Sequence, residues 1–130
     1  EDVMVGKTIK DKAKIKELND VDNDDLILDI GPKTIKKINN VIENSETILW
    51  NGPAGYFENP CFANGSYEIA KKIVNKNKNN SIYSIVGGGD TIALLNQINV
   101  IDNFNFVSTA GGAFLEYLEG KELPGIKALN

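Results

Sequence analysis

Four short runs of β-type apolar residues each lead through a glycine-containing turn into a segment with helical periodicity. The expected strands are Leu26–Ile30, Thr47–Trp50, 81–86 and 104–107. The expected helices are 33–44, 62–77, 90–96 and 111–119. Strand and helix alternating in this way is typical of a parallel sheet covered by helices on both faces. The sequence therefore predicts an α/β fold, a three-layer αβα sandwich with a parallel sheet.

The remaining segments are expected to contribute less to this architecture. Residues 3–5 have the composition of a further strand. Residues 7–25 are mostly lysine, aspartate and asparagine, which predicts a solvated surface loop with at most one turn of helix. Residues 123–129 are expected to be irregular. In the first helix, Ile35, Ile38, Val41 and Ile42 are predicted to share the buried face.

The turns that follow the four strands are the most informative part of the chain. In an open parallel sheet, ligands bind beyond the carboxyl ends of the strands, and these turns are expected at that edge. Small residues before a helix leave backbone N–H groups free, and the helix dipole favours an anion there. Several such turns in one chain predict a surface that handles phosphate.

Length and composition exclude several classes of protein. The chain has 130 residues, of which 42% are hydrophobic, enough for one compact domain with a core. No apolar run approaches the roughly 18 residues that span a bilayer. The net charge of -4 disfavours a nucleic-acid-binding surface. Cys61 is the single cysteine and has no partner for an internal disulfide, which fits the reducing cytoplasm.

All fourteen cationic side chains are lysines, and the chain has neither histidine nor arginine. A Ser-His-Asp or Cys-His catalytic arrangement and a histidine-ligated zinc site are therefore excluded. Cys61 is interpreted as a small apolar residue, because no histidine can activate it. Arginine is the usual bidentate clamp for carboxylate and phosphate. If such a substrate is bound, its clamp is expected on a polypeptide segment not present here.

Single residues in the turns admit two interpretations each. Asp90 follows three glycines and precedes a helix, so it is either the N-cap of that helix or an oxygen ligand of a phosphate-bound Mg²⁺. Asn51 either closes a turn before Gly52 or contacts a ligand. Glu58, taken alone, is a solvated carboxylate. The run Gly87-Gly88-Gly89-Asp90 is neither a dinucleotide fingerprint nor a P-loop, because no lysine follows it.

Taken together, these turns resemble phosphoglycerate kinase. The resemblance is carried, in the family's order and spacing, by Asp29-Ile30-Gly31-Pro32-Lys33-Thr34, Trp50-Asn51-Gly52-Pro53-Ala54-Gly55-Tyr56-Phe57-Glu58, Gly87-Gly88-Gly89-Asp90-Thr91, Ser108-Thr109-Ala110-Gly111-Gly112-Ala113 and Leu118-Glu119-Gly120-Lys121-Glu122-Leu123-Pro124-Gly125. It covers the chain except for about residues 8–25. It implies that residues 1–130 are the C-terminal part of the nucleotide-binding domain, without the N-terminal substrate domain, and that the parent enzyme is a cytoplasmic monomer.

The resemblance also implies roles for individual residues. Asp90 would bind the Mg²⁺ of ADP or ATP, and Thr91 the phosphates. Glu58 would hold the ribose hydroxyls. The remaining nucleotide-binding positions are Asn51 and Pro53 at the phosphate chain, Leu28 and Tyr56 at the adenine, and Gly87, Gly88 and Gly89 at the phosphates. Backbone N–H groups would meet the transferred phosphoryl group at four catalytic positions, Gly88, Gly89, Gly111 and Gly112.

The implied reaction is phosphoryl transfer between 1,3-bisphosphoglycerate with ADP and 3-phosphoglycerate with ATP, in glycolysis. Its acceptor is already ionised, so no general base is needed, and catalysis consists of positioning and charge neutralisation. The alternatives are a non-catalytic nucleotide-binding module and a sugar-type kinase, for which Asp90 is the one candidate base. The chain departs from the commonest family motif at Tyr56, Ala110 and Phe114.

The chain alone is expected to be inactive, because it lacks the phosphoglycerate site. It is also expected to self-associate or to be marginally stable, because a truncated sheet exposes an edge strand, at residues 3–5 or 81–86, and the apolar faces of helices.

Overall fold

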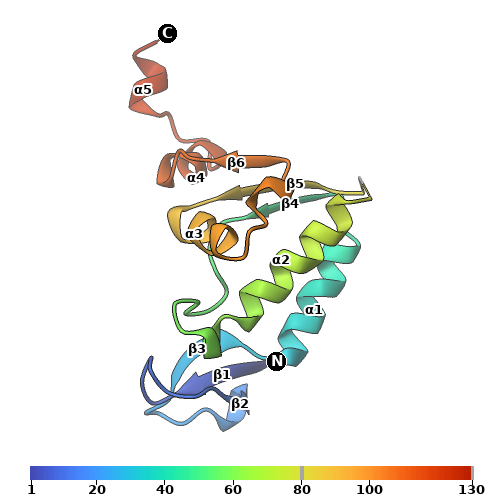
Figure 1. Ribbon diagram of the computed structural model, residues 1–130. Helices are drawn as coiled ribbons and strands as arrows, with labels where there is room; N and C mark the ends of the chain where they lie inside the picture. Colours follow the sequence, from blue (N-terminus) through green and yellow to red (C-terminus); the bar gives the residue numbers. More distant parts are fainter. Residues whose placement is uncertain (80, 130) are drawn as a thin grey trace.

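The computed structural model describes residues 1–79 and 81–129 and contains a parallel sheet, which lies in the upper half of Figure 1. Strands β4 (Thr47–Trp50), β5 (Tyr83–Gly87) and β6 (Phe106–Ser108) form this sheet in the order β4-β5-β6 (Figure 1). Leu49 pairs with Ile85, and Ile85 with Phe106. The α/β fold with a parallel sheet is confirmed.

A second sheet is antiparallel and was not predicted. Strand β1 (Asp2–Gly6) lies between β2 (Lys14–Glu17) and β3 (Leu26–Ile30). The prediction that Leu26–Ile30 joins the parallel sheet is therefore wrong. The prediction that 7–25 is a loop is wrong for β2, which precedes a 3-10 turn, η1 (Leu18–Asp20). Propensity missed β2 because it is mostly charged, and only pairing with β1 makes it a strand.

The position of the open strand edges also differs from expectation. β1 and β5 are the central strands of the two sheets, so the prediction of an exposed edge at residues 3–5 or 81–86 is wrong. The outer strands among the described residues are β2 and β3 in one sheet, and β4 and β6 in the other.

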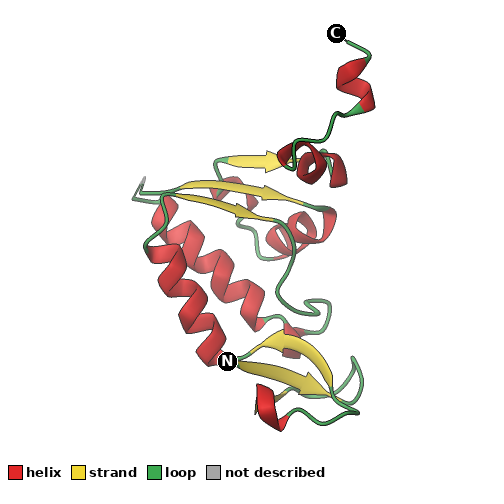
Figure 2. Ribbon diagram, turned by 180° about the vertical axis from the view of Figure 1, so that it is seen from behind, coloured by secondary structure: helices red, strands yellow, loops and turns green. Residues whose placement is uncertain are grey.

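Helices cover one face of the parallel sheet. Helices α1 (Pro32–Glu43) and α2 (Asn64–Asn77) pack side by side, and α3 (Gly89–Gln97) lies on the same face (Figures 1 and 2). One core cluster joins them to the sheet, and its members include Ile42, Trp50, Phe57, Ile69, Ile73, Val74, Val86, Leu94, Leu95 and Phe104. Val41, predicted to face inward, is exposed.

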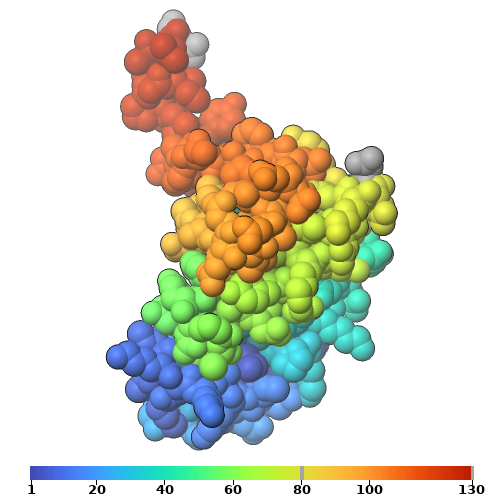
Figure 3. Space-filling view, in the orientation of Figure 1, coloured from blue at the N-terminus to red at the C-terminus, as the bar shows by residue number. Residues whose placement is uncertain are grey.

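The opposite face of the parallel sheet is only partly covered. Leu49, Tyr83 and Phe106 point to this face and are 41%, 50% and 49% exposed. Helix α4 (Gly112–Leu118) follows β6, and a short α5 (Pro124–Lys127) projects from the body of the molecule (Figures 1 and 3). The predicted irregular tail thus contains one helical turn. None of the helices described is long and apolar enough to cross a membrane.

Candidate functional site

The turns that follow β4 and β5 are fastened to each other. The backbone N–H of Gly52 donates to the hydroxyl of Thr91 at 2.9 Å. The side chain of Asn51 lies so close to Gly88 that a β-carbon there would overlap its Oδ1 atom. Gly88 also has a φ of 87°, a conformation that costs little only for glycine. Two of the predicted phosphate-binding turns therefore form one continuous surface.

Asp90 lies on this surface with its carboxylate exposed. Helix α3 has Gly88 as its N-cap and no side-chain capping bond, so the alternative that Asp90 is the N-cap is not realised. Asp90 instead occupies the first turn of α3, beside the exposed Gly89. An exposed carboxylate oxygen beside a phosphate-binding turn suits Mg²⁺, which usually takes one or two carboxylates together with substrate phosphates. The residues present thus fit the metal that the resemblance implies.

Thr91 has a different environment from the one expected of a phosphate contact. Its side chain is fully buried, and its oxygen accepts the bond from Gly52. The structure therefore gives Thr91 the task of joining the two turns.

A pocket of about 360 Å³ lies between β3 and the loop after β4. Its lining includes three of the predicted nucleotide-binding residues, Leu28, Pro53 and Tyr56. Two hydrogen bonds fix its walls, from the N–H of Tyr56 to the carbonyl of Leu28 at 2.7 Å and from the N–H of Ala54 to the hydroxyl of Ser66 at 2.8 Å. The structure thus brings the predicted adenine contacts together, although β3 belongs to the antiparallel sheet.

Glu58 is not among the residues that line that pocket. It is exposed and lines a neighbouring hollow of about 260 Å³ with Tyr56, Ile9 and Lys10. Tyr56 borders both spaces, so a ligand lying over its ring could reach both.

The turn after β6 contains the other predicted glycines. Gly111 has a φ of 57°, and Gly112 begins α4. Ala110 is not among the described residues with a positive φ, so the alanine is free of left-handed backbone strain. Phe114 lies over Gly87, where an added β-carbon would be 3.2 Å from its ring. The departures at Ala110 and Phe114 are thus accommodated.

Asp29 is a residue of this region whose burial the sequence did not predict. It is 2% exposed, and its carboxylate accepts hydrogen bonds from the N–H groups of Ile30 and Gly65, both at 2.8 Å. Burial raises the pKa of Asp29, and the two hydrogen bonds only partly offset this effect. The available sequence signal is a carboxylate inside the apolar run Leu26–Ile30.

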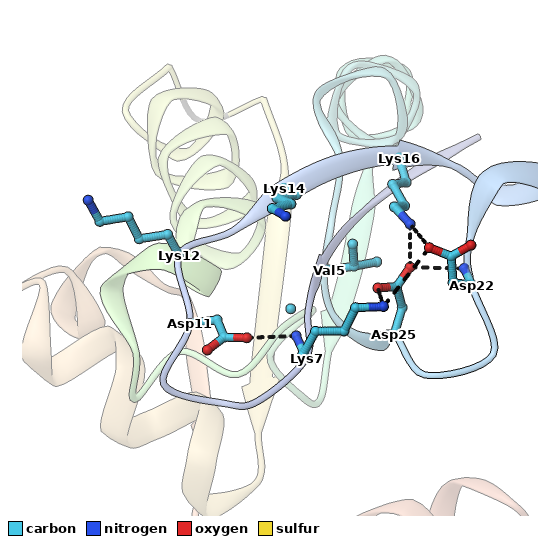
Figure 4. A pocket seen from close by; sticks show the side chains of 9 residues that line it. Val5, Lys7, Asp11, Lys12, Lys14, Lys16, Asp22 and Asp25 are labelled. Atoms are coloured by element: carbon cyan, nitrogen blue, oxygen red, sulfur yellow. Dashed lines mark hydrogen bonds and ion pairs between the residues drawn. The ribbon is translucent and has the colours of Figure 1, made fainter.

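A separate hollow of about 330 Å³ lies in the antiparallel hairpin (Figure 4). Lys7 and Lys16 converge there on Asp25, while Lys12 points away. Lys16 also pairs with Asp22 at 2.7 Å. Hydrogen bonds from Lys16 and Lys7 hold the pKa of Asp25 well below its usual range. Ion pairs of Lys7 and Lys16 with Asp22 and Asp25 line this hollow, which explains how so polar a segment is ordered.

The acidic cluster in that hairpin does not require a metal ion. Asp22, Asp24 and Asp25 bring carboxylate oxygens within 4.8 Å of one another, a spacing that a cation could bridge. Lys7 and Lys16 already supply the opposing charge.

Comparisons with known proteins agree with this geometry. A family model described as phosphoglycerate kinase matches residues 1–121. The chain is 48% identical over 130 residues to the phosphoglycerate kinase of Zymomonas mobilis, covering 98% of this chain and 33% of that protein. It is 53% identical over 103 residues to that of Orientia tsutsugamushi, covering 79% of this chain and 25% of that protein.

Solved structures give the same answer. Phosphoglycerate kinase from Coxiella burnetii superposes with a TM-score of 0.88 at 44% identity, covering 99% of this chain and 33% of that one. The enzyme from Pyrococcus horikoshii gives a TM-score of 0.81 at 31% identity, covering 98% and 31%. The chain thus spans about a third of the length of these relatives.

Proposed function

The chain belongs to the phosphoglycerate kinase family, and from this premise we propose that it supplies part of the Mg-nucleotide site of a cytoplasmic enzyme. That enzyme transfers a phosphoryl group between 1,3-bisphosphoglycerate with ADP and 3-phosphoglycerate with ATP. In this proposal, residues 1–130 are the C-terminal part of the nucleotide-binding domain. The phosphoglycerate and its basic contacts belong to an N-terminal domain of the same monomeric protein.

The observation that carries the proposal is the Gly52–Thr91 hydrogen bond, which joins the turns after β4 and β5. It places Asn51, Gly88 and Asp90 on one surface. The backbone N–H groups in the first turn of α3 have no acceptor within the helix, so they are available to anionic oxygens. The pocket of Leu28, Pro53 and Tyr56 then receives the adenine, and Glu58 the ribose.

The chemistry follows from these roles. The Asp90 carboxylate would hold Mg²⁺, which when bound neutralises charge on the transferred phosphoryl group. Backbone N–H groups of Gly88, Gly89, Gly111 and Gly112 stabilise the same charge. Neither step needs histidine or arginine from this chain. The 130-residue chain alone is proposed to bind nucleotide without turnover. The alternative, a non-catalytic nucleotide-binding module, would show binding without turnover in the complete protein as well.

Calorimetric titration tests the proposal. The product of the complete reading frame that contains this chain should bind ADP more tightly with Mg²⁺ than with a chelator present. Asp90→Ala should remove this difference between the two titrations, because it removes the metal's carboxylate ligand. Asp102→Ala, which changes another exposed aspartate away from the turns, should retain it. Absence of ADP binding by the parent protein would contradict the proposed function.

A further inference from the structure

The Asp29 carboxylate lies at the meeting point of three segments. It comes from β3, and it accepts from Ile30 in the same strand and from Gly65 at the start of α2. It also lines the pocket with Leu28, Pro53 and Tyr56. Both of its hydrogen-bond donors are backbone N–H groups, and none of the ion pairs found within residues 1–79 and 81–129 involves it. Burying a carboxylate without a cationic partner costs free energy, so the presence of Asp29 at this point calls for an explanation beyond packing.

Two glycines make room for this carboxylate. A β-carbon on Gly55 would lie 2.5 Å from Asp29 Oδ1, and one on Gly65 would overlap the same atom. Gly55 belongs to the loop that forms one wall of the pocket, and Gly65 belongs to α2. The carboxylate therefore fills the space between the pocket loop and the helix.

The rest of the pocket wall depends on the same contacts. The residue before Asp29 accepts the hydrogen bond from Tyr56, and the residue after Gly65 accepts the one from Ala54. A shift of the Asp29 carboxylate would thus move Leu28 and the loop 53–56 relative to each other. Those are the two walls that would enclose a flat base.

We propose that Asp29 is a positioning residue that sets the width of the slot for the nucleotide base, acting through Gly55 and Gly65. This inference rests on the proposed function. Asp29 does not itself contact the transferred group. A purely structural Asp29 would instead affect every ligand of the protein equally, because its loss would only lower the folded fraction.

The two roles are separated by comparing a ligand that has a base with one that lacks it. Isothermal titration would use Mg-ADP and Mg-tripolyphosphate on the product of the complete reading frame. In Asp29→Asn, an NH₂ group replaces one acceptor oxygen, so one of the two backbone N–H groups faces a donor. We expect the Kd of Mg-ADP to rise about fivefold or more, the effect of disturbing roughly one hydrogen bond, and the Kd of Mg-tripolyphosphate to stay within about twofold.

A control variant and a second variant accompany Asp29→Asn. Asp102→Asn, an exposed change of the same kind, should leave both constants unaltered. Gly65→Ala offers a second route, because its added β-carbon would displace the carboxylate without removing its charge and Gly65 does not line the pocket, so it should give the same split. Equal weakening of both ligands, or unchanged Mg-ADP binding by folded variants, would overturn the inference. A parent protein that fails to bind Mg-ADP would instead contradict the proposed function, on which the inference depends.

Discussion

The side-chain oxygen of Thr91 accepts a hydrogen bond from the backbone N–H of Gly52 at 2.9 Å, across 39 positions of the chain. Thr91 is fully buried at the start of α3, whereas Gly52 lies in the loop after β4. The bond therefore couples the end of one parallel strand to the helix that follows the next. Asn51, which packs on Gly88, repeats the same coupling a few ångströms away.

Replacing Thr91 by valine should loosen this coupling while preserving the shape of the side chain. The N–H of Gly52 would lose its acceptor, and the free energy of unfolding should fall by about 1–3 kcal/mol. Thr91→Ser retains the hydroxyl and should cost less. Urea denaturation of both variants measures the difference, and a Thr91→Val protein as stable as Thr91→Ser would show that the bond contributes little.

Removal of the Asp90 carboxylate should act on catalysis. Under the proposed function, Asp90→Ala in the product of the complete reading frame should lower turnover by roughly two orders of magnitude, because charge on the transferred group would lose its metal-based neutralisation. The stability of the protein should change little, since Asp90 is exposed and caps nothing. Steady-state kinetics at saturating Mg²⁺ tests this, and turnover within threefold of the parent would exclude Asp90 from the metal site.

Glu58 should contribute to nucleotide binding. Under the proposed function, Glu58→Ala would remove one charge-assisted hydrogen bond to the ribose, so the KM for ADP should rise by an amount equivalent to about 1–2 kcal/mol. Glu46→Ala is the matched control, because Glu46 is also exposed but lies at the amino end of β4, opposite the site. An unchanged KM for ADP in the Glu58 variant would remove this residue from the site.

The strands and helices that face the site could be predicted because local patterns determine them. Thr47–Trp50 carries a compact β-type run, and the apolar spacing in 62–77 matches α2. Strand partners are determined by contacts between residues distant in sequence. Local patterns therefore could not show that Leu26–Ile30 pairs with β1 in the antiparallel sheet. The residues that cap helix ends can also be distant in sequence, and local patterns then do not reveal them. Asp2 is buried and accepts hydrogen bonds from the N–H groups of Lys33 and Thr34, so α1 is capped from 31 to 32 residues away.

For the candidate site, the positions of the turns could be predicted from the sequence, whereas the roles of their residues in ligand binding stay predictions. The glycine-rich turns could be recognised in the sequence, because glycine is the residue that lets other atoms approach the backbone so closely. The burial of Asp29 was not, because it depends on Gly55 and Gly65 meeting at one point in space.

The ion pairs of Asp25 with Lys7 and Lys16 should make the free energy of unfolding depend on pH at acidic pH. Hydrogen bonds from Lys16 and Lys7 lower the pKa of Asp25 below its ordinary 3.8. The unfolded chain therefore takes up a proton at higher pH than the folded chain, and the stabilisation is present above pH 3.8 and lost as pH falls toward the folded-state pKa. Asp25→Asn should flatten this part of the stability curve.

Asp20→Asn, a change at an exposed carboxylate of the same segment, serves as the control and should leave the curve unaltered. Thermal unfolding followed by circular dichroism from pH 2 to pH 6 provides the comparison. Parallel curves for the parent protein and Asp25→Asn would mean that the ion pairs with Lys7 and Lys16 do not stabilise the hairpin.

The partly bare face of the parallel sheet should make the 130-residue chain self-associate. Leu49, Tyr83 and Phe106 form an apolar surface there, and β4 and β6 are the outer strands beside it. Uncovered apolar patches and open strand edges both pair with other chains. A Tyr83→Lys, Phe106→Lys double variant should shift light scattering at micromolar concentration toward the monomer. Val41→Lys, which adds a charge at an exposed apolar position on α1, should leave the light scattering unchanged. If the unsubstituted 130-residue chain is monomeric and unfolds in one sharp thermal transition, this prediction is contradicted.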